Sequence, residues 1–141
     1  MDDTHDLQRF IAAQSLVFLQ VCAELTAGAK MSHWMWFVFP QLKDLGLSPT
    51  AQYFGIGSWA EAEGYWHHPV LGPRLKHCTE LVLAVEGKTA LEIFGSPDDI
   101  KLRSSMTLFA EVAPDEPVFT RALDRYFEGE RDELTMALLW A

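Results

Sequence analysis

The chain has 141 residues and a formal net charge of −9, from 11 basic and 20 acidic side chains. This length suits one domain, and 49% hydrophobic with 22% charged residues is typical of a folded globular protein rather than a disordered or fibrous one. The negative charge argues against nucleic acid or an anionic membrane as the main partner, because both require clustered positive charge. A small anionic ligand needs only two or three donors, so this charge does not exclude one.

The start of the chain and its two cysteines indicate a soluble cytoplasmic protein. Residues 1–10 are acidic where a secretory signal would be basic. The longest continuous apolar run, Trp34 to Pro40, is far shorter than the roughly 18 residues that a membrane span needs. Cys22 and Cys78 share no metal-type or redox-type spacing, so we expect two buried thiols rather than a disulfide.

A long amphipathic helix is predicted over residues 4–27. Asp3 or Thr4 is placed to cap its start, and Gly28 is placed to end it. Apolar residues recur along this segment at helical spacing, with one polar member in the stripe. The stripe consists of Leu7, Phe10, Ile11, Gln14, Val17, Phe18, Val21, Cys22 and Leu25.

The segment from Lys30 to Gln41 is apolar on every side, so its periodicity fits a buried helix and a buried strand equally. Helices are expected before and after it. This context favours a short helix that ends near Pro40.

The rest of the chain carries a series of helix-start signals and predicts an all-α fold. A serine precedes a proline at Ser48 and Ser96, and capping-box patterns begin at Ser58 and Thr89. No alternating strand pattern is found. We therefore expect a single all-helical domain over residues 1–141, with seven to eight short helices in an irregular bundle or superhelix-like packing. Further helices are expected over residues 69–86, 115–128 and 132–140.

The aromatic run from Ser32 to Gln41 is the first candidate site. Rings such as that of Trp36 stack on flat ligands, while His33 and Gln41 would supply polar contacts. A histidine also titrates near neutral pH and is suited to general acid or base catalysis. The competing interpretation is that the run belongs to the core, because aromatic runs are usually buried.

Residues 98–109 form the second candidate. On a helix, Lys101 and Ser105 lie one turn apart beside the apolar face. An ammonium group next to a hydroxyl would bind a phosphate or carboxylate, or would activate Ser105 as a nucleophile. In the competing interpretation, serine bonds back to the carbonyl one turn earlier, and Lys101 reaches water or pairs with Asp98.

The common catalytic and metal-binding motifs are absent from the sequence. The five histidines and two cysteines show no zinc-type spacing. There is no glycine-rich phosphate loop and no G-x-S-x-G turn. We therefore predict no metal and no cofactor.

Two strings in these segments, SHWMWFxFPQ from Ser32 and KLxSSMTLF from Lys101, resemble a small bacterial family catalogued as domain of unknown function 1810. The resemblance spans nearly the whole chain. It implies an all-helical single domain with superhelix-like packing, and it implies no particular reaction. It also implies that the polar residues of the two segments are family features: Lys30, Ser32, His33, Gln41, Lys101, Ser104, Ser105 and Thr107.

These observations favour a bacterial protein with one polar and aromatic pocket for a small anionic ligand, such as a nucleotide-like or ADP-ribose-like molecule. The expected ligand-binding residues are the eight above together with Trp36. Whether the pocket is catalytic stays open, with His33, Lys101 and Ser105 as the candidates. This hypothesis predicts that the two strings converge on one cleft, with His33 within reach of Lys101 or Ser105.

The alternative is a non-catalytic protein–protein interaction module. Trp59, Trp66 and Trp140 would be its anchors, and it predicts an exposed apolar patch. Under either hypothesis we expect a monomer or a weak homodimer, with no nucleic acid and no membrane as partner.

Overall fold

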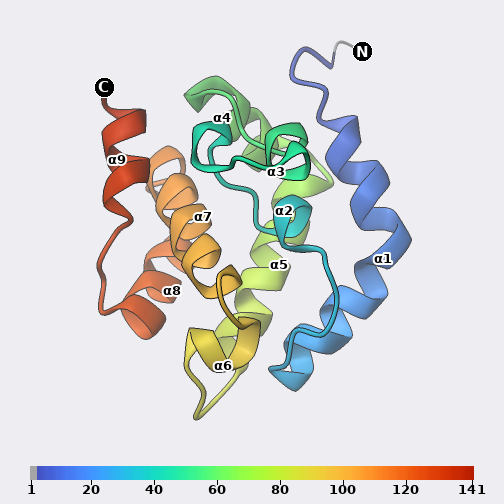
Figure 1. Cartoon of the computed structure of the whole chain (residues 1–141), viewed down its shortest axis with the longest axis vertical. Coiled ribbons are helices and arrows are strands. Elements are labelled where there is room, and N and C mark those ends of the chain that lie inside the picture. Colours follow the sequence, from blue (N-terminus) through green and yellow to red (C-terminus); the bar gives the residue numbers. More distant parts are fainter. Residues whose placement is uncertain (1–2) are drawn as a thin grey trace.

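The chain forms helices where apolar stripes lie between capping residues. The computed structural model describes residues 3–141 and contains within that range nine α-helices and no β-strand (Figure 1). The all-α prediction is confirmed, with more helices than the seven to eight expected. The elements are α1 (Gln8–Ala27), α2 (Met35–Val38), the 3-10 turn η1 (Lys43–Leu45), α3 (Pro49–Tyr53), α4 (Trp59–His67), α5 (Leu71–Ala84), α6 (Ala90–Phe94), α7 (Asp98–Val112), α8 (Pro117–Phe127) and α9 (Glu133–Leu139).

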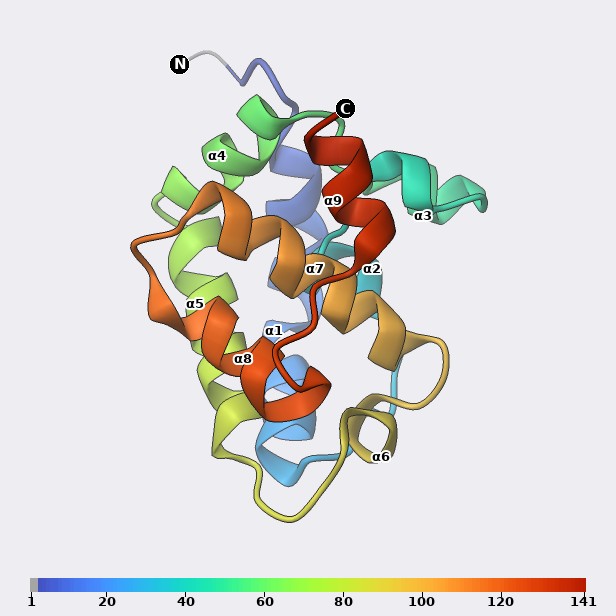
Figure 2. The same ribbon diagram turned by 90° about the vertical axis from the view of Figure 1, so that its left-hand side faces the viewer.

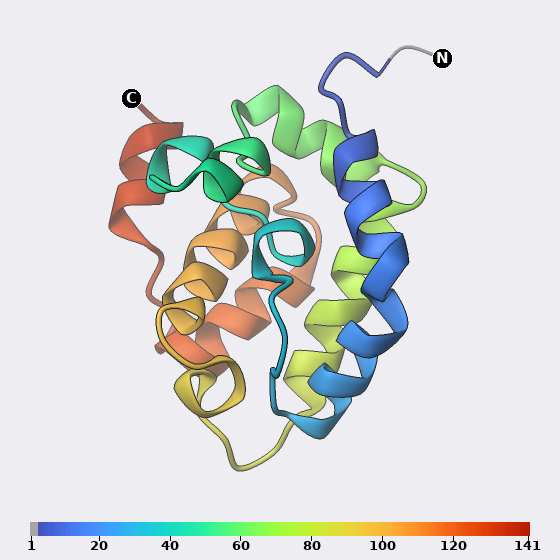
Figure 3. The ribbon, with the colours of Figure 1, turned by 45° about the vertical axis from the view of Figure 1, so that its right-hand side comes forward.

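The helices surround one core that extends from α1 to α8. Helices α1 and α5 lie side by side on one side of the molecule, while α7, α8 and α9 form the other side (Figures 1 and 3). A column of rings joins the two sides. Phe10 of α1 meets Tyr65 of α4 at 5.0 Å between centroids, Tyr65 meets Phe109 of α7 at 5.4 Å, and Phe109 meets Phe119 of α8 at 5.7 Å.

The first helix begins later than predicted. Asp3 caps the turn before it, because its Oδ1 accepts a hydrogen bond from the Leu7 N–H at 2.7 Å and its Oδ2 accepts one from the Gln8 N–H at 3.0 Å. The helix therefore starts at Gln8. Its end is as predicted, because Gly28 adopts the left-handed conformation with φ of 69°.

Helix α1 has the length and mean hydropathy of a membrane span, although it contains no long continuous apolar run. Among residues 3–141 it is the one helix that is long and apolar enough to cross a membrane by length and composition, and only 28% of its apolar window is buried inside the protein. A search for a continuous apolar run misses it, because Gln14, Ser15 and Gln20 interrupt the apolar residues.

The helix expected within residues 30–41 is reduced to the four residues of α2. Before α2, backbone N–H groups are held by partners elsewhere in the chain. That of Lys30 donates to the carbonyl of Ile93 at 2.8 Å, and those of Met31 and Ser32 donate to Glu24. Residues 30–32 are therefore held to α6 and α1 before the helix begins at Met35.

The helix-start signals are confirmed at three positions. Ser48, Ser58 and Thr89 each accept a hydrogen bond from a backbone N–H in the first turn. Thr89 with Glu92 closes a reciprocal capping box. The box predicted at Ser58 is not closed, because the Glu61 carboxylate accepts from the Gly57 N–H at 3.2 Å instead. The fourth start is wrong in detail, because Pro97 rather than Ser96 occupies the capping position of α7.

The two thiols are free, as expected. Cys78 is buried, whereas Cys22 is only half-buried. Burial is the main cause that raises the pKa of both thiols above the ordinary value of a cysteine.

Candidate functional site

Two lysines meet at the carboxylate of Asp98, where the segment after α1 crosses the start of α7. The Lys30 ammonium lies 2.8 Å from Asp98 Oδ2, and the Lys101 ammonium lies 3.5 Å from Asp98 Oδ1. We call Lys30, Asp98 and Lys101 the lysine cluster. Two cations share one carboxylate here, so the cluster carries a formal excess of positive charge in a chain of net charge −9.

The local structure explains why both lysines reach the Asp98 carboxylate. Asp98 occupies the first turn of α7, where the helix dipole favours a negative charge, and Lys101 follows three residues later on the same side. Lys30 comes from a different element. The backbone hydrogen bond to Ile93 holds it beside α6, and its ammonium also donates to the carbonyl of Ser32 at 2.6 Å.

Each lysine also lies over an indole ring. The Lys30 ammonium is 5.0 Å from the ring centroid of Trp34, and the Lys101 ammonium is 4.8 Å from that of Trp36, both within cation–π range. The two pairs differ in access to solvent. Trp34 is buried and the Lys30 side chain is 7% exposed, whereas Trp36 is half-buried and the Lys101 side chain is 23% exposed.

Lys101, Trp36 and Gln41 line one small cavity. Its volume is about 10 Å³, which is space for about one water molecule. Met35, Phe39 and residues of α3 and the loop after it close the remaining walls. The structure thus brings together three of the predicted site residues. The cavity is too small to enclose a nucleotide.

Ser32, another predicted site residue, contacts a carboxylate of the protein itself. Glu24 accepts hydrogen bonds from the Ser32 hydroxyl at 2.6 Å and from the Trp34 indole N–H at 2.9 Å. It also accepts bonds from Gln20 and from the backbone N–H groups of Met31 and Ser32. Burial opposes ionisation of Glu24, but these hydrogen bonds outweigh it and lower its pKa to about 2.

The hydroxyl groups of α7 point into the protein. Ser104 and Thr107 donate to the carbonyls four residues earlier. The competing interpretation expects such a bond from the serine beside Lys101, but Ser105 does not form it. Thr107 also accepts a hydrogen bond from the Asp132 N–H at 2.9 Å, which fixes the start of α9. Ser105 is fully buried, and its Oγ has no hydrogen-bond partner among the residues that the structure describes. None of the three lines the cavity beside Lys101.

His33 is exposed and does not line the cavity beside Lys101. The imidazole and the Lys101 ammonium thus do not share that cavity, in contrast to the geometry that the pocket hypothesis predicts. Within residues 3–141, no group of three or more histidine, cysteine, aspartate or glutamate side chains is placed to hold a metal ion.

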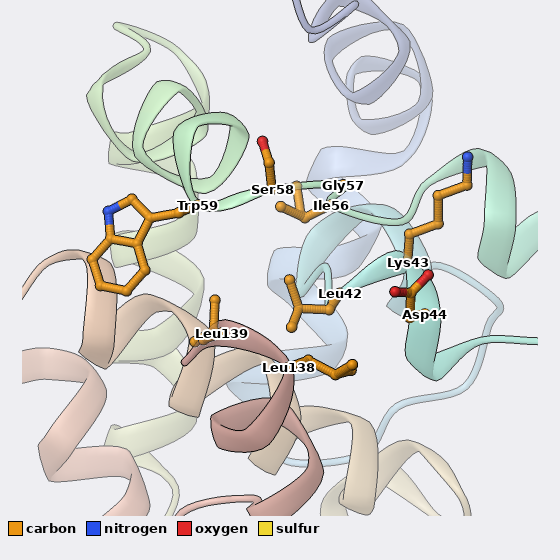
Figure 4. A pocket seen from close by; sticks show the side chains of 9 residues that line it. All are labelled: Leu42, Lys43, Asp44, Ile56, Gly57, Ser58, Trp59, Leu138 and Leu139. Carbon is orange, nitrogen blue, oxygen red and sulfur yellow. The ribbon is translucent and has the colours of Figure 1, made fainter. Parts of the chain in front are cut away.

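A second, larger hollow, which the sequence analysis did not predict, lies between η1, the start of α4 and α9. Its volume is about 160 Å³ (Figure 4). Leu42, Ile56, Leu138 and Leu139 form its apolar wall, and Lys43 and Asp44 lie at one side. Apolar residues within short loops, such as Leu42 and Ile56, are the signal that could have indicated it.

The three tryptophans proposed as anchors are engaged inside the chain. Trp59 and Trp140 pack edge to face at 5.2 Å between centroids, and Trp140 donates its indole N–H to Glu111 at 3.0 Å. Trp66 packs against Phe119 at 5.2 Å. Trp140 alone of the three keeps a large exposed surface, at 64%.

Comparison with known proteins supports the resemblance seen in the sequence. Residues 4–139 match the family described as protein of unknown function (DUF1810). The fold is similar to the crystal structure of the conserved hypothetical protein Rv1873 from Mycobacterium tuberculosis, with 52% sequence identity, a TM-score of 0.97 and 99% of each chain covered. A comparison with functionally curated proteins gives no match. The chain therefore belongs to the DUF1810 family.

Proposed function

We propose that this protein binds a small anion at the lysine cluster, through Lys101 and the exposed side of Trp36. The supporting observation is the sharing of Asp98 between two lysines. Lys30 is buried and forms the shorter contact with Asp98, so it offsets the charge of that carboxylate. The Lys101 ammonium is thereby left with charge to offer a phosphate or carboxylate.

The cavity volume restricts how a ligand is held. A space of about 10 Å³ accepts no ring, so a nucleotide-like or ADP-ribose-like ligand would bind at the surface. Its phosphate would contact Lys101 and Gln41, and its flat ring would stack on Trp36. We propose binding rather than catalysis, because Ser105 is fully buried and His33 lies outside the cavity.

A thermal-shift screen of the purified protein tests this proposal. The panel contains inorganic phosphate, ADP, ADP-ribose, sugar phosphates and simple dicarboxylates. A ligand at about a hundredfold excess over its Kd adds about 2.7 kcal/mol to the free energy of unfolding, which is readily detected in a domain of this size. Lys101→Ala should abolish the shift, and Trp36→Ala should weaken only the ligands that carry a ring.

The matched control is Lys76→Ala. This variant removes a lysine that pairs with Glu116 at 2.9 Å, away from the cluster. Both it and His33→Ala should bind as the wild type does. A folded protein that shows no shift with any compound, or a shift that survives Lys101→Ala, would contradict the proposal.

One observation favours the alternative, an interaction module. Leu16, Leu19 and Met31 expose 87%, 88% and 80% of their surfaces. Exposed large apolar side chains of this kind are typical of a protein–protein contact when they are grouped. Leu16 and Leu19 both lie on α1, and Met31 follows the end of that helix.

A further inference from the structure

Helix α1 has an outer face without any charged side chain. Its two charged residues, Arg9 and Glu24, are both engaged inside the chain: Arg9 pairs with Glu61 at 2.7 Å, and Glu24 holds the hydrogen bonds described above. The outer face instead carries Leu16 and Leu19, the two most exposed residues of α1 among the large apolar side chains. Helix α1 lies at the edge of the molecule in Figures 1 and 3 and at the back in Figure 2, and the exposure of Leu16 and Leu19 shows that this face is open.

The exposed residues of this face follow the spacing of a coiled-coil seam. Five of them recur at alternating intervals of four and three residues, the period at which one helix keeps a stripe toward a partner helix. All five are exposed. We call them the α1 seam: Ala12, Leu16, Leu19, Ala23 and Thr26.

The centre of the seam is symmetric. Reversing the helix about the midpoint between Leu16 and Leu19 places Leu16 opposite Leu19 and Ala12 opposite Ala23. A two-fold axis through that midpoint therefore pairs the seam with its own antiparallel copy, with leucines facing at the centre and alanines facing on both sides. Ser15 and Gln20, the neutral polar residues that flank the leucines, also face each other in this register.

We propose that this protein forms a symmetric homodimer by antiparallel pairing of the α1 seam with that of a second copy. The charge of the chain supports this partner. Two molecules of net charge −9 repel each other over most of their surfaces, and they come into contact at lowest cost where side-chain charge is absent. A membrane-surface helix would instead place several lysine or arginine residues beside its apolar face. Helix α1 carries no exposed one, and Arg74 of α5, which donates to Ser15 at 3.4 Å, is a single half-buried cation.

Sedimentation velocity over about 1 to 500 µM protein tests the dimer, because a weak dimer dissociates within that range. The wild type should shift from monomer to dimer as concentration rises. Leu16→Glu/Leu19→Glu should weaken association at least tenfold, because four carboxylates would then face one another. Both sites are exposed, so thermal unfolding should confirm an intact fold.

The control is Leu47→Glu/Leu134→Glu, which adds the same charge at exposed leucines outside α1. It should dimerise as the wild type does. A wild type that stays monomeric throughout would overturn the proposal. So would a seam variant that dimerises normally, or a control that weakens association as much as the seam variant.

Cysteine cross-linking tests the register in a Cys22→Ser background. Ala12→Cys chains mixed with Ala23→Cys chains should form a disulfide between the two, whereas neither should link to itself. Efficient self-linking of either would indicate parallel pairing and overturn the symmetry. Flotation with phosphatidylcholine and phosphatidylserine vesicles tests a membrane as the partner. If the wild type binds vesicles and Leu16→Glu/Leu19→Glu abolishes this binding, the face belongs to a membrane and the dimer proposal is overturned.

Discussion

The carboxylate of Glu24 joins the end of α1 to the segment that leads into α2. It accepts hydrogen bonds from three side chains and two backbone N–H groups, and these donors come from both sides of the turn at Gly28. Because Trp34 is buried, its indole N–H needs an acceptor inside the protein. Glu24 supplies that acceptor, which explains why a charged residue is buried here.

Glu24→Gln should destabilise the protein by about 2–3 kcal/mol near neutral pH, because it weakens several charge-assisted hydrogen bonds at once. The folded pKa of about 2 lies below the ordinary value of 4.5, so the contribution of Glu24 is complete above pH 4.5 and is lost as the pH falls toward 2. Urea unfolding from pH 6 to pH 2 should therefore show the difference between wild type and variant shrinking. A difference that is constant with pH would contradict this explanation.

At the scale of elements, the contact between α4 and the start of α5 requires a glycine. A Cβ atom at Gly72 would overlap the carbonyl oxygen of Trp66, which is backbone and cannot turn aside. The position is therefore fixed by how closely the two helices approach. Gly64, within α4, differs because a Cβ there would meet only the side chains of His5 and Leu7, at ordinary contact distances.

Gly72→Ala should destabilise the protein by several kcal/mol, in the range of severe steric substitutions. Gly64→Ala should be neutral or stabilise it by up to about 1 kcal/mol, because alanine is the better helix former. Thermal unfolding of the two variants beside the wild type checks both expectations. Equal stability of the two variants would show that the start of α5 moves to accept the Cβ.

Helix α1 carries apolar residues on two sides, one toward the core and one toward solvent. Its inner stripe, which includes Phe10 and Gln14, packs toward α5 and α2, and Gln14 donates to the carbonyl of Phe37 at 2.6 Å and to the Tyr65 hydroxyl at 2.9 Å. Its outer stripe carries the α1 seam. A helix that is apolar on both sides belongs in a core or at an interface, and here one side is open.

At the scale of the whole molecule, the positive charges are dispersed and largely engaged. Arg9 pairs with Glu61 and also donates to four backbone carbonyls, and Arg125 donates to the carbonyls of Leu83 and Val85. Lys30 and Lys76 pair with carboxylates. This leaves few cations to contact consecutive phosphates of a nucleic acid.

We therefore expect no binding to DNA or RNA. Fluorescence anisotropy with labelled duplex and single-stranded oligonucleotides at low salt should show no saturable change up to about 100 µM protein, the weak end of ordinary non-specific affinity. Saturable binding that weakens as salt is added would contradict this expectation. It would indicate a basic surface made by residues that are far apart in the sequence.

Local sequence patterns are sufficient to predict the fold class, most helix boundaries and part of the candidate site. Capping residues, proline and glycine act on the backbone within a few residues. Their neighbours in the sequence are therefore enough to identify the helix caps and the helix end formed by Ser48, Ser58, Thr89 and Gly28. The pairing of Lys101 with Asp98, one turn apart on α7, is one of the two alternatives that the competing interpretation offers for Lys101, and it is also a local contact. The segment from Lys30 to Gln41 is ambiguous in the sequence, because hydrogen bonds to α1 and α6 hold its first part.

What each polar residue faces depends on how the whole chain packs. Ser32 donates a hydrogen bond to Glu24, and Thr107 accepts one from the N–H of Asp132 at the start of α9. Lys30 forms an ion pair with Asp98, which lies 68 positions later in the chain. The solvent exposure of the α1 seam likewise depends on how the other helices pack. Sequence periodicity shows that a stripe is apolar, but whether another element covers it depends on the packing of the whole chain, which local patterns do not contain.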